Sequence, residues 1–297
     1  MRLGRRFVAC LTSTLSWAAG AATLSAQQQF GGELVGEGVV SLPDQGETFP
    51  SLSADGEILY FSRVKDGRGW SEQQIMWARW DGDGWGEPQV LPFSDATASD
   101  RAPRSAPDDS FLIFSSNRAL PGDGGSGEYN IWMVEQNGQA WGAPIPVPGA
   151  LNSHQRDAHG SVAADGTIYF YSTRDGSLGR GDIWRSSASD GGYGEPVNLG
   201  PPVNSALSQP DLWISPSQEW MILVITDHPE GYGGDDLYLS EFRDGAWTEP
   251  VNLGPAVNTA EYEYGPFVDA TGTWLYFVSH RTGGGDIYRI RLREVLR

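Results

Sequence analysis

An eleven-residue phrase occurs twice in this sequence. EPVNLGPPVNS spans 195–205 and EPVNLGPAVNT spans 249–259, so the copies differ at two positions and lie 54 residues apart. Five related units surround these copies and begin at Glu47, Asp100, Asp157, Gln209 and Glu263, at intervals of 53, 57, 52 and 54 residues. A period of this kind indicates a repeat architecture, in which one supersecondary unit is used several times. We therefore expect five copies of one small sheet.

Each unit contains a turn that is followed by a continuous apolar run. The runs are ILYF from Ile58, FLIF from Phe111, IYFY from Ile168, WMIL from Trp220 and WLYF from Trp274. Apolar residues at consecutive rather than alternate positions indicate a strand that is buried on both faces. The sheets should therefore pack against neighbours on both sides.

Two further strands complete the unit. One contains QIM at 74–76, NIW at 130–132, DIW at 182–184, DLY at 236–238 and DIY at 286–288. The last follows an aromatic residue and a proline, in WGEP, WGAP, YGEP and WTEP, and proline is tolerated best in an edge strand. The fifth unit stops before this outer strand, whereas GEGVVSLP at 36–43 precedes the first unit.

We predict an all-β chain, with one domain over residues 27–297. The fold is a single five-bladed β-propeller of four-stranded blades, closed by an N-terminal strand that completes the last blade. Such closure removes the exposed sheet edges of an open stack. The 39 Gly, 19 Pro and 12 Trp residues suit many short strands joined by turns.

These repeats also carry a family resemblance over nearly the whole predicted domain. DGEILYFS, DGTIYFYSTR, GTWLYFVSHRTGGGDIYR and NTAEYEYGP, together with the EPVNLG phrases, resemble the TolB-like, WD-like propeller repeats of bacterial envelope proteins. They are similar to repeats found beside OmpA-type peptidoglycan-binding domains. The fourth unit departs most, with Ser217-Gln218 in its turn and His228 where other units carry arginine. The resemblance implies an envelope location and leaves the function open, because fold does not determine function.

The first 26 residues have the pattern of a secretory signal peptide. A basic start, MRLGRR, precedes an uncharged and mostly apolar stretch from Phe7 to Leu24, and Ala26 offers a small residue for cleavage. A transmembrane anchor is the alternative. We expect a periplasmic or secreted protein without a membrane span in its mature chain. Cys10, the only cysteine, would be removed with this segment.

The chain is strongly acidic, with a formal charge of −18 that becomes −21 when Arg2, Arg5 and Arg6 are removed. Nucleic acid is therefore not an expected partner, because phosphate binding needs a concentrated basic surface. Divalent cations and basic protein surfaces are compatible with this charge, as is a purely solubilising role. We expect a monomer without a cofactor, although a structural cation is compatible with the sequence.

The five unit starts form the candidate site. In a closed ring, Glu47, Asp100, Asp157, Gln209 and Glu263 must lie on one circle, which we expect at a mouth of the channel. One interpretation is that each side chain caps its own turn by accepting backbone amides. The other is that four carboxylates bind a cation or a basic partner segment. We refer to these five residues as the start column.

Other polar residues are weaker candidates. We expect ion pairs of Arg174 with Asp182 and of Arg281 with Asp286, which would tie hairpin loops. His154 and His159 flank Asp157, but this spacing does not establish a zinc site, and all histidines are expected at the surface. Trp77, Trp132 and Trp184 are expected in the core between blades.

Two classes of function follow. A non-enzymatic binding or scaffold module would dock a protein, peptide or envelope polymer at its channel face. The alternative is a carbohydrate-active enzyme, because five-bladed propellers also host glycosidases that use a pair of carboxylates. The recurrence of similar acidic residues in nearly every unit favours the binding module, since catalysis requires an asymmetric pair with different roles.

Overall fold

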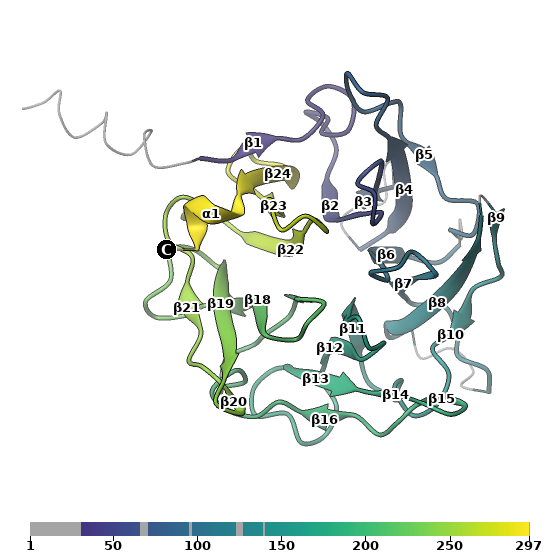
Figure 1. Ribbon diagram of the computed structural model, residues 1–297, viewed down its shortest axis with the longest axis vertical. Helices are drawn as coiled ribbons and strands as arrows, with labels where there is room; N and C mark the ends of the chain where they lie inside the picture. The colour runs from purple at the N-terminus through teal and green to yellow at the C-terminus, as the bar shows by residue number, and fades with distance from the viewer. Residues whose placement is uncertain (1–30, 66–70, 95–96, 123–126, 139, 297) are drawn as a thin grey trace, which may run out of the picture.

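Each repeat unit folds into an antiparallel sheet of four strands, and the five sheets are arranged in a ring, whose centre we call the channel (Figure 1). The computed structural model describes residues 31–65, 71–94, 97–122, 127–138 and 140–296. The first blade consists of β2 (Glu47–Leu52), β3 (Ile58–Val64), β4 (Gln73–Arg79) and β5 (Gln89–Val90), which lie in this order from the channel outward. The predicted propeller of five four-stranded blades is confirmed.

The other blades repeat this order. The second contains β6 (Asp100–Ser105), β7 (Phe111–Ser116), β8 (Asn130–Asn137) and β10 (Ile145–Pro146), and β9 (Ala140–Trp141) also pairs with β8. The third contains β11 (Asp157–Val162), β12 (Ile168–Ser172), β13 (Asp182–Ser186) and β16 (Val197–Asn198). Between β13 and β16 the chain forms a small separate hairpin, β14 (Ala188–Ser189) and β15 (Gly192–Tyr193). The fourth contains β17 (Leu212–Ile214), β18 (Trp220–Thr226), β19 (Asp235–Arg243) and β21 (Val251–Asn252), and β20 (Ala246–Trp247) also pairs with β19.

The fifth blade joins the two ends of the chain. Its strands are β22 (Glu263–Val268), β23 (Trp274–Ser279), β24 (Asp286–Arg291) and, on the outside, β1 (Glu33–Leu34), and the short helix α1 (Leu292–Val295) follows β24. Strand β1 pairs with β24, with Leu34 opposite Tyr288 (Figure 1). Closure by an N-terminal strand is thus confirmed. The strand precedes the Gly36–Pro43 stretch, which instead turns back towards the first blade.

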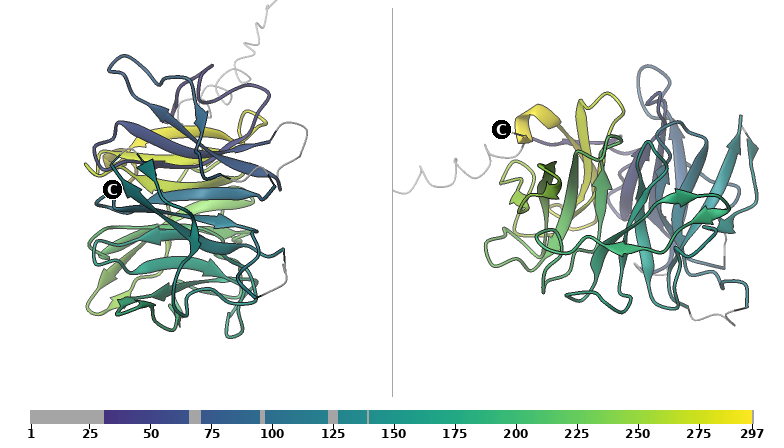
Figure 2. Two further views of the ribbon diagram at one scale, coloured as in Figure 1. Left: turned by 90° about the vertical axis from the view of Figure 1, so that its right-hand side faces the viewer. Right: turned by 60° about the horizontal axis from the view of Figure 1, so that its bottom comes forward.

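The core lies between neighbouring blades, which stack face to face in the side views (Figure 2). The second strand of every blade is buried on both faces, as Leu59, Ile113, Phe170, Leu223 and Phe277 illustrate with exposed fractions of 0%. Continuous apolar runs in the sequence produce this two-sided burial. Among the predicted core tryptophans, Trp132 and Trp184 are buried and Trp77 packs against the core from a partly buried position.

The eleven-residue phrase ties the connection that follows the outer strand to the third strand of the blade. Asn204 Oδ1 accepts from the backbone N of Ile183 at 2.8 Å, and its Nδ2 donates to the carbonyl of the same residue at 2.8 Å. Asn258 makes the same two bonds to Leu237. The short outer strands need these side-chain bonds because two-residue strands supply few ladder bonds of their own.

The innermost strands are irregular near their first residues, where they line the channel. Register shifts in four of them mark a bulge, and the third residue of each has a positive φ: Phe49 at 53°, Ala102 at 52°, His159 at 52° and Gly265 at 65°. In the fourth blade, Asp211 occupies this position and β17 begins one residue later. A bulge interrupts the alternation of side chains along a strand. Which residues face the channel therefore cannot be read from simple alternation.

Within the described ranges, no helix is long and apolar enough to cross a lipid bilayer. The predicted signal peptide, residues 1–26, lies outside the described residues.

Candidate functional site

The start column lies at the beginning of the innermost strands, inside the blades. All five side chains have an exposed fraction of 0%. Each carboxylate accepts from the loop that precedes its strand or from an arginine of the same blade. The donors are Leu42 N and Arg63 Nε to Glu47, Ser94 Oγ and Arg118 Nη2 to Asp100, Ser153 N and Arg174 Nη2 to Asp157, and Thr259 N and Ser279 Oγ to Glu263.

These contacts correct the ion pair expected at Arg174. Its Nη2 lies 2.6 Å from Asp157 Oδ1, whereas Asp182 accepts from the backbone N of Leu178 and from Asn198 Nδ2. Similarly, Arg281 Nη2 lies 3.5 Å from Glu263 Oε1, whereas Asp286 accepts a hydrogen bond from Thr282 Oγ1. The arginine follows the second strand and reaches back across the hairpin to the start of the first. It therefore ties these two strands together.

The fourth blade replaces both members of this pair. Gln209 exchanges hydrogen bonds with Ser205, and His228 stands where the second, third and fifth blades carry arginine. These positions are equivalent because each residue contacts the aromatic side chain of the third strand in its blade. The ring centroids of His228 and Tyr238 lie 5.4 Å apart, and the guanidinium groups of Arg174 and Arg281 lie over the rings of Trp184 and Tyr288. Because the fourth blade lacks the arginine, a carboxylate at position 209 would be buried without a charged partner. The uncharged amide of Gln209 avoids this cost.

Burial dominates the electrostatics of the start column. It raises the pKa of Glu47 to about 7 despite the neighbouring Arg63, and it raises the pKa of Glu263 despite bonds from Ser279 and Thr259. Glu47, Asp157 and Glu263 each accept a hydrogen bond from one backbone N–H, which is the contact that the capping interpretation describes. Binding of a cation or a partner at these positions stays a prediction. The described residues contain no group of three or more His, Cys, Asp or Glu side chains that could hold a metal ion.

A second ring of equivalent positions lies two residues further along each innermost strand. It consists of Phe49, Ala102, His159, Asp211 and Gly265, which are chemically different in every blade. The backbone N of the bulge residue reaches the preceding blade, because Ala102 N donates to Ser62 Oγ and Gly265 N donates to Asp211 Oδ2. This ring both connects blades and lines the channel axis.

His159 is the histidine for which the surface expectation is wrong. Its Nδ1 lies 2.7 Å from the carbonyl of Pro210, and a carbonyl only accepts, so Nδ1 carries the proton. The other nitrogen, Nε2, is buried and has no hydrogen-bond partner among the described residues. Burial, followed by the charge of Arg101, holds the pKa of His159 well below its usual value. His159 is therefore a neutral imidazole with a free lone pair beside Phe49, at a ring distance of 4.7 Å.

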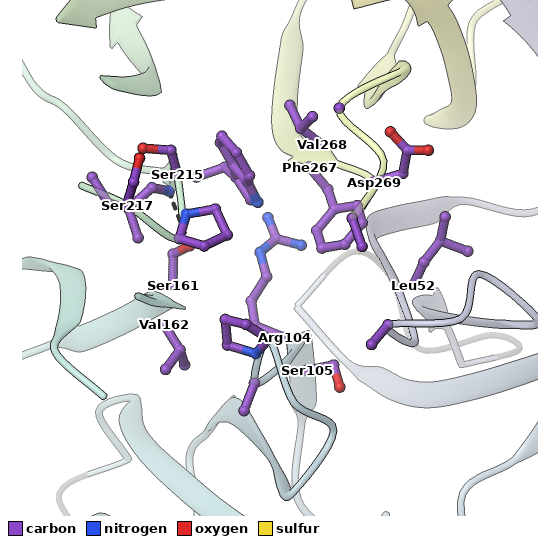
Figure 3. A pocket seen from close by; sticks show the side chains of 18 of the residues that line it. Leu52, Arg104, Ser105, Ser161, Val162, Ser215, Ser217, Phe267, Val268 and Asp269 are labelled. Atoms are coloured by element: carbon purple, nitrogen blue, oxygen red, sulfur yellow. Dashed lines mark hydrogen bonds between the residues drawn. The ribbon is translucent and has the colours of Figure 1, made fainter. Parts of the chain in front are cut away.

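A pocket of about 440 Å³ opens at the other end of the innermost strands (Figure 3). Turns and strand ends from all five blades contribute to it, and its walls include Val162, Trp213, Trp220, Phe267 and Val268. The rings of Trp213 and Trp220 are in contact, with centroids 4.8 Å apart. The pocket is therefore mainly apolar and partly aromatic, and it lies opposite the start column along the channel.

Arg104 forms the floor of this pocket. Figure 3 shows its side chain rising into the centre of the pocket beside Phe267. The guanidinium donates from Nη1 to the carbonyl of Pro50 at 2.6 Å and from Nη2 to the carbonyl of Pro266 at 3.0 Å. It is 2% exposed and, among the residues that the structure describes, forms no ion pair. Burial lowers the pKa of Arg104, and Asp211 partly opposes this effect.

Sequence reasoning missed the channel residues because it searched for recurrence. The start column is nearly uniform, whereas the second ring and the positions of Arg104, Ser161, Trp213 and Phe267 differ from blade to blade. Equivalent positions whose residues vary among the otherwise regular repeat units would have indicated the residues at the channel. Specific recognition of one ligand requires such asymmetry at the channel.

The fold and this channel define a five-bladed β-propeller with an asymmetric pocket at one end of its channel. Its solved neighbours include a putative TolB from Agrobacterium tumefaciens, with a TM-score of 0.50 and 17% identity over 80% of this chain and 72% of that one. They also include an α-L-arabinofuranosidase from Lactobacillus brevis, with a TM-score of 0.53 and 12% identity over 87% and 94% of the chains. A GH43 endo-arabinanase from Bacillus licheniformis has a TM-score of 0.52 and 11% identity over 85% and 96%.

These identities establish a shared fold alone. The TolB structure agrees at that level with the TolB-like resemblance of the repeats. No protein-family model matches the chain, and no curated protein sequence matches it significantly.

Proposed function

We propose that this protein is a non-enzymatic binding propeller of the bacterial envelope, periplasmic or secreted, whose channel face docks a segment of a protein, peptide or envelope polymer. The observation that carries this proposal is the pocket around Arg104. It is concave, mostly apolar and built from every blade, which are the properties of a binding site. The likeness of the repeats to TolB-like envelope propellers supports the location.

The lining of the pocket supports binding rather than glycoside hydrolysis. Hydrolysis of this kind uses two carboxyl groups, about 5–10 Å apart. Asp269 is the one carboxylate among the described lining residues. Its Oδ1 already accepts from the backbone N of Thr273 and Trp274, and its Oδ2 accepts from Thr271. The similarity in fold to an α-L-arabinofuranosidase and an endo-arabinanase keeps the glycosidase alternative open to test.

Capture of an envelope partner by pocket variants tests the binding proposal. Trp220→Ala removes an aromatic wall of the pocket, and Trp274→Ala is its matched control because Trp274 begins the equivalent strand of the fifth blade outside the pocket. We expect the pocket variant to lose about tenfold or more in affinity, as truncation of a buried aromatic anchor does. The control should bind like the parent protein.

Two further measurements complete this test. Glu263→Gln reports on the start column, and a loss of partner or calcium binding confined to that variant would move the site to the opposite end of the channel. Incubation with arabinan and a panel of plant and bacterial glycans addresses catalysis. Sustained turnover that Asp269→Asn abolishes would replace the binding proposal with the enzymatic one.

A further inference from the structure

Arg104 places a buried positive charge at the channel, and among the described residues no ion pair compensates it. Charged side chains are seldom buried without a partner, because removal from water is costly unless an opposite charge or full hydrogen bonding replaces it. The nearest acidic influence on Arg104 is Asp211, which forms no ion pair with it and whose own pKa burial raises to about 7. At neutral pH this carboxyl group is only partly ionised.

Two N–H donors of Arg104 remain available to a further acceptor. A guanidinium has five N–H groups. The structure gives Arg104 three carbonyl acceptors, those of Pro50, Pro266 and, at 3.5 Å, Pro103. Two donors are therefore left without a protein acceptor in the described part of the chain. The fork of a guanidinium binds a planar carboxylate through two parallel, charge-assisted N–H···O bonds.

The rest of the pocket determines what must accompany the anionic group. The Arg104 guanidinium lies over the ring of Phe267, and the indoles of Trp213 and Trp220 add apolar surface to the same pocket. The lining hydroxyls have partners of their own, since Ser161 Oγ accepts from Ile214 N and Ser215 Oγ accepts from Trp220 N. A ligand with many hydroxyl groups would find few free partners here, whereas an apolar or aromatic group would fill the walls.

We infer that the pocket is a carboxylate-binding site, in which Arg104 receives the free carboxylate of a ligand whose apolar or aromatic body packs against Trp213, Trp220 and Phe267. This inference rests on the proposed binding function and specifies its ligand chemistry. The carboxylate can belong to a small aryl or alkyl acid or to the C-terminus of a peptide. Both sources present the same group to Arg104, and the probes below distinguish them.

Pairs of acids and their neutral amides test the inference directly. Phenylacetate with phenylacetamide represents small acids, and N-acetyl-Gly-Gly-Phe with its C-terminal amide represents peptide ends. Calorimetric titration of the parent protein should show that the acid of at least one pair binds about tenfold or more tightly than its amide, because only the acid accepts charge-assisted bonds. Preference within the first or second pair identifies the source.

An Arg104→Lys variant shows whether this residue reads the charge. Lysine keeps the positive charge but not the planar fork, so the preference for acid over amide should fall by about tenfold while amide binding stays unchanged. Trp220→Ala should weaken acid and amide alike. Near-ultraviolet circular dichroism and the melting temperature establish that each variant is folded.

Three outcomes would overturn the inference. The acids and amides of both pairs bind the parent equally, or none of the four probes binds at millimolar concentration, or Arg104→Lys retains the full preference in a folded protein. In all three cases partner capture that depends on Trp220 can persist, so the proposed function survives. Conversely, glycan turnover would contradict the proposed function and leave the acid–amide comparison unaffected.

Discussion

Asp211 occupies a position that a bulge residue fills in the other four blades. Its Oδ1 accepts from the backbone N of Leu212 and its Oδ2 from the backbone N of Gly265, both at 2.8 Å. The second bond crosses from the fourth blade to the fifth. Burial is the largest cause that raises the pKa of this carboxyl to about 7, and the positive charge of Arg104 opposes it.

This raised pKa predicts a pH dependence of stability. Between pH values near its unfolded pKa of about 4 and its folded pKa of about 7, Asp211 binds more protons in the folded state than in the unfolded state. Its contribution to the free energy of unfolding is therefore full at low pH and is lost as the pH rises towards 7. Asp211→Asn cannot titrate, so its stability relative to the parent protein should rise as the pH rises.

Denaturant titrations of both proteins at several pH values between about 5 and 8 measure this difference. His159 acts in the opposite sense, because its lowered pKa makes the folded state less stable as the pH falls. Both proteins contain His159, so its effect cancels in the comparison. Parallel pH profiles would show that Asp211 does not titrate in this range.

At the scale of the element, a buried charge pair ties the hairpin between the first two strands of the third blade, where Arg174 contacts Asp157. The fourth blade carries Gln209 and His228 at these positions, and Gln209 bonds to Ser205 instead. Both members of the charge pair are therefore replaced in the fourth blade. The fourth hairpin also keeps the common turn, since Gln218 has a φ of 61° where Gly166 has 83°.

Gln209→Glu should destabilise the protein, because it buries a carboxylate in a blade that lacks the arginine. We expect a loss of about 2–4 kcal/mol, similar to that for an unpaired buried charge. The double variant Gln209→Glu with His228→Arg restores the pair of the other blades. It should recover about 1–3 kcal/mol of this loss, the coupling expected for residues in contact.

Denaturant unfolding of the parent, both single variants and the double variant completes the cycle. His228→Arg alone serves as the control, since a half-exposed arginine with no carboxylate partner should change stability by less than about 1 kcal/mol. Additive effects would mean that position 228 does not reach position 209. The pairing seen in the other blades would then not transfer to the fourth.

At the scale of the whole molecule, closure depends on a strand of only two residues. Leu34 faces Tyr288 across the β1–β24 ladder, and Val35 N donates to the carbonyl of Ile287. The segment that follows buries Val40 between the first and fifth blades, and Arg63 donates to the carbonyl of Val40. Loss of this segment exposes the edge of β24 and removes a partner of Arg63.

Truncation to begin at Asp44 should therefore lower the melting temperature and promote self-association through the open edge, as exposed edge strands do. The matched control begins at Gly31 and retains β1. Light scattering after size exclusion, together with thermal melting, compares the two chains. If the shorter chain is monomeric and melts with the longer one, closure by β1 contributes little to the ring.

The repeat was readable at the level of strands because its signal is local. Consecutive apolar residues such as those from Ile168 predict a doubly buried strand without reference to any other unit. The partners of individual side chains were less predictable. The sequence pairs Arg174 with Asp182 by proximity in one loop, but a guanidinium on a long side chain instead reaches Asp157 across the hairpin at 2.6 Å.

The sequence by itself determined the number of blades, the order of their strands and the closure of the ring, since each follows from patterns within about fifty residues or from counting units. Only the tertiary structure decided what faces the channel. Bulges shift the alternation at Phe49, Ala102 and His159, and ring closure brings Arg104 to the carbonyl of Pro266, 162 residues away. A site formed by such distant positions depends on where the blades meet, because each repeat contributes only some of its residues.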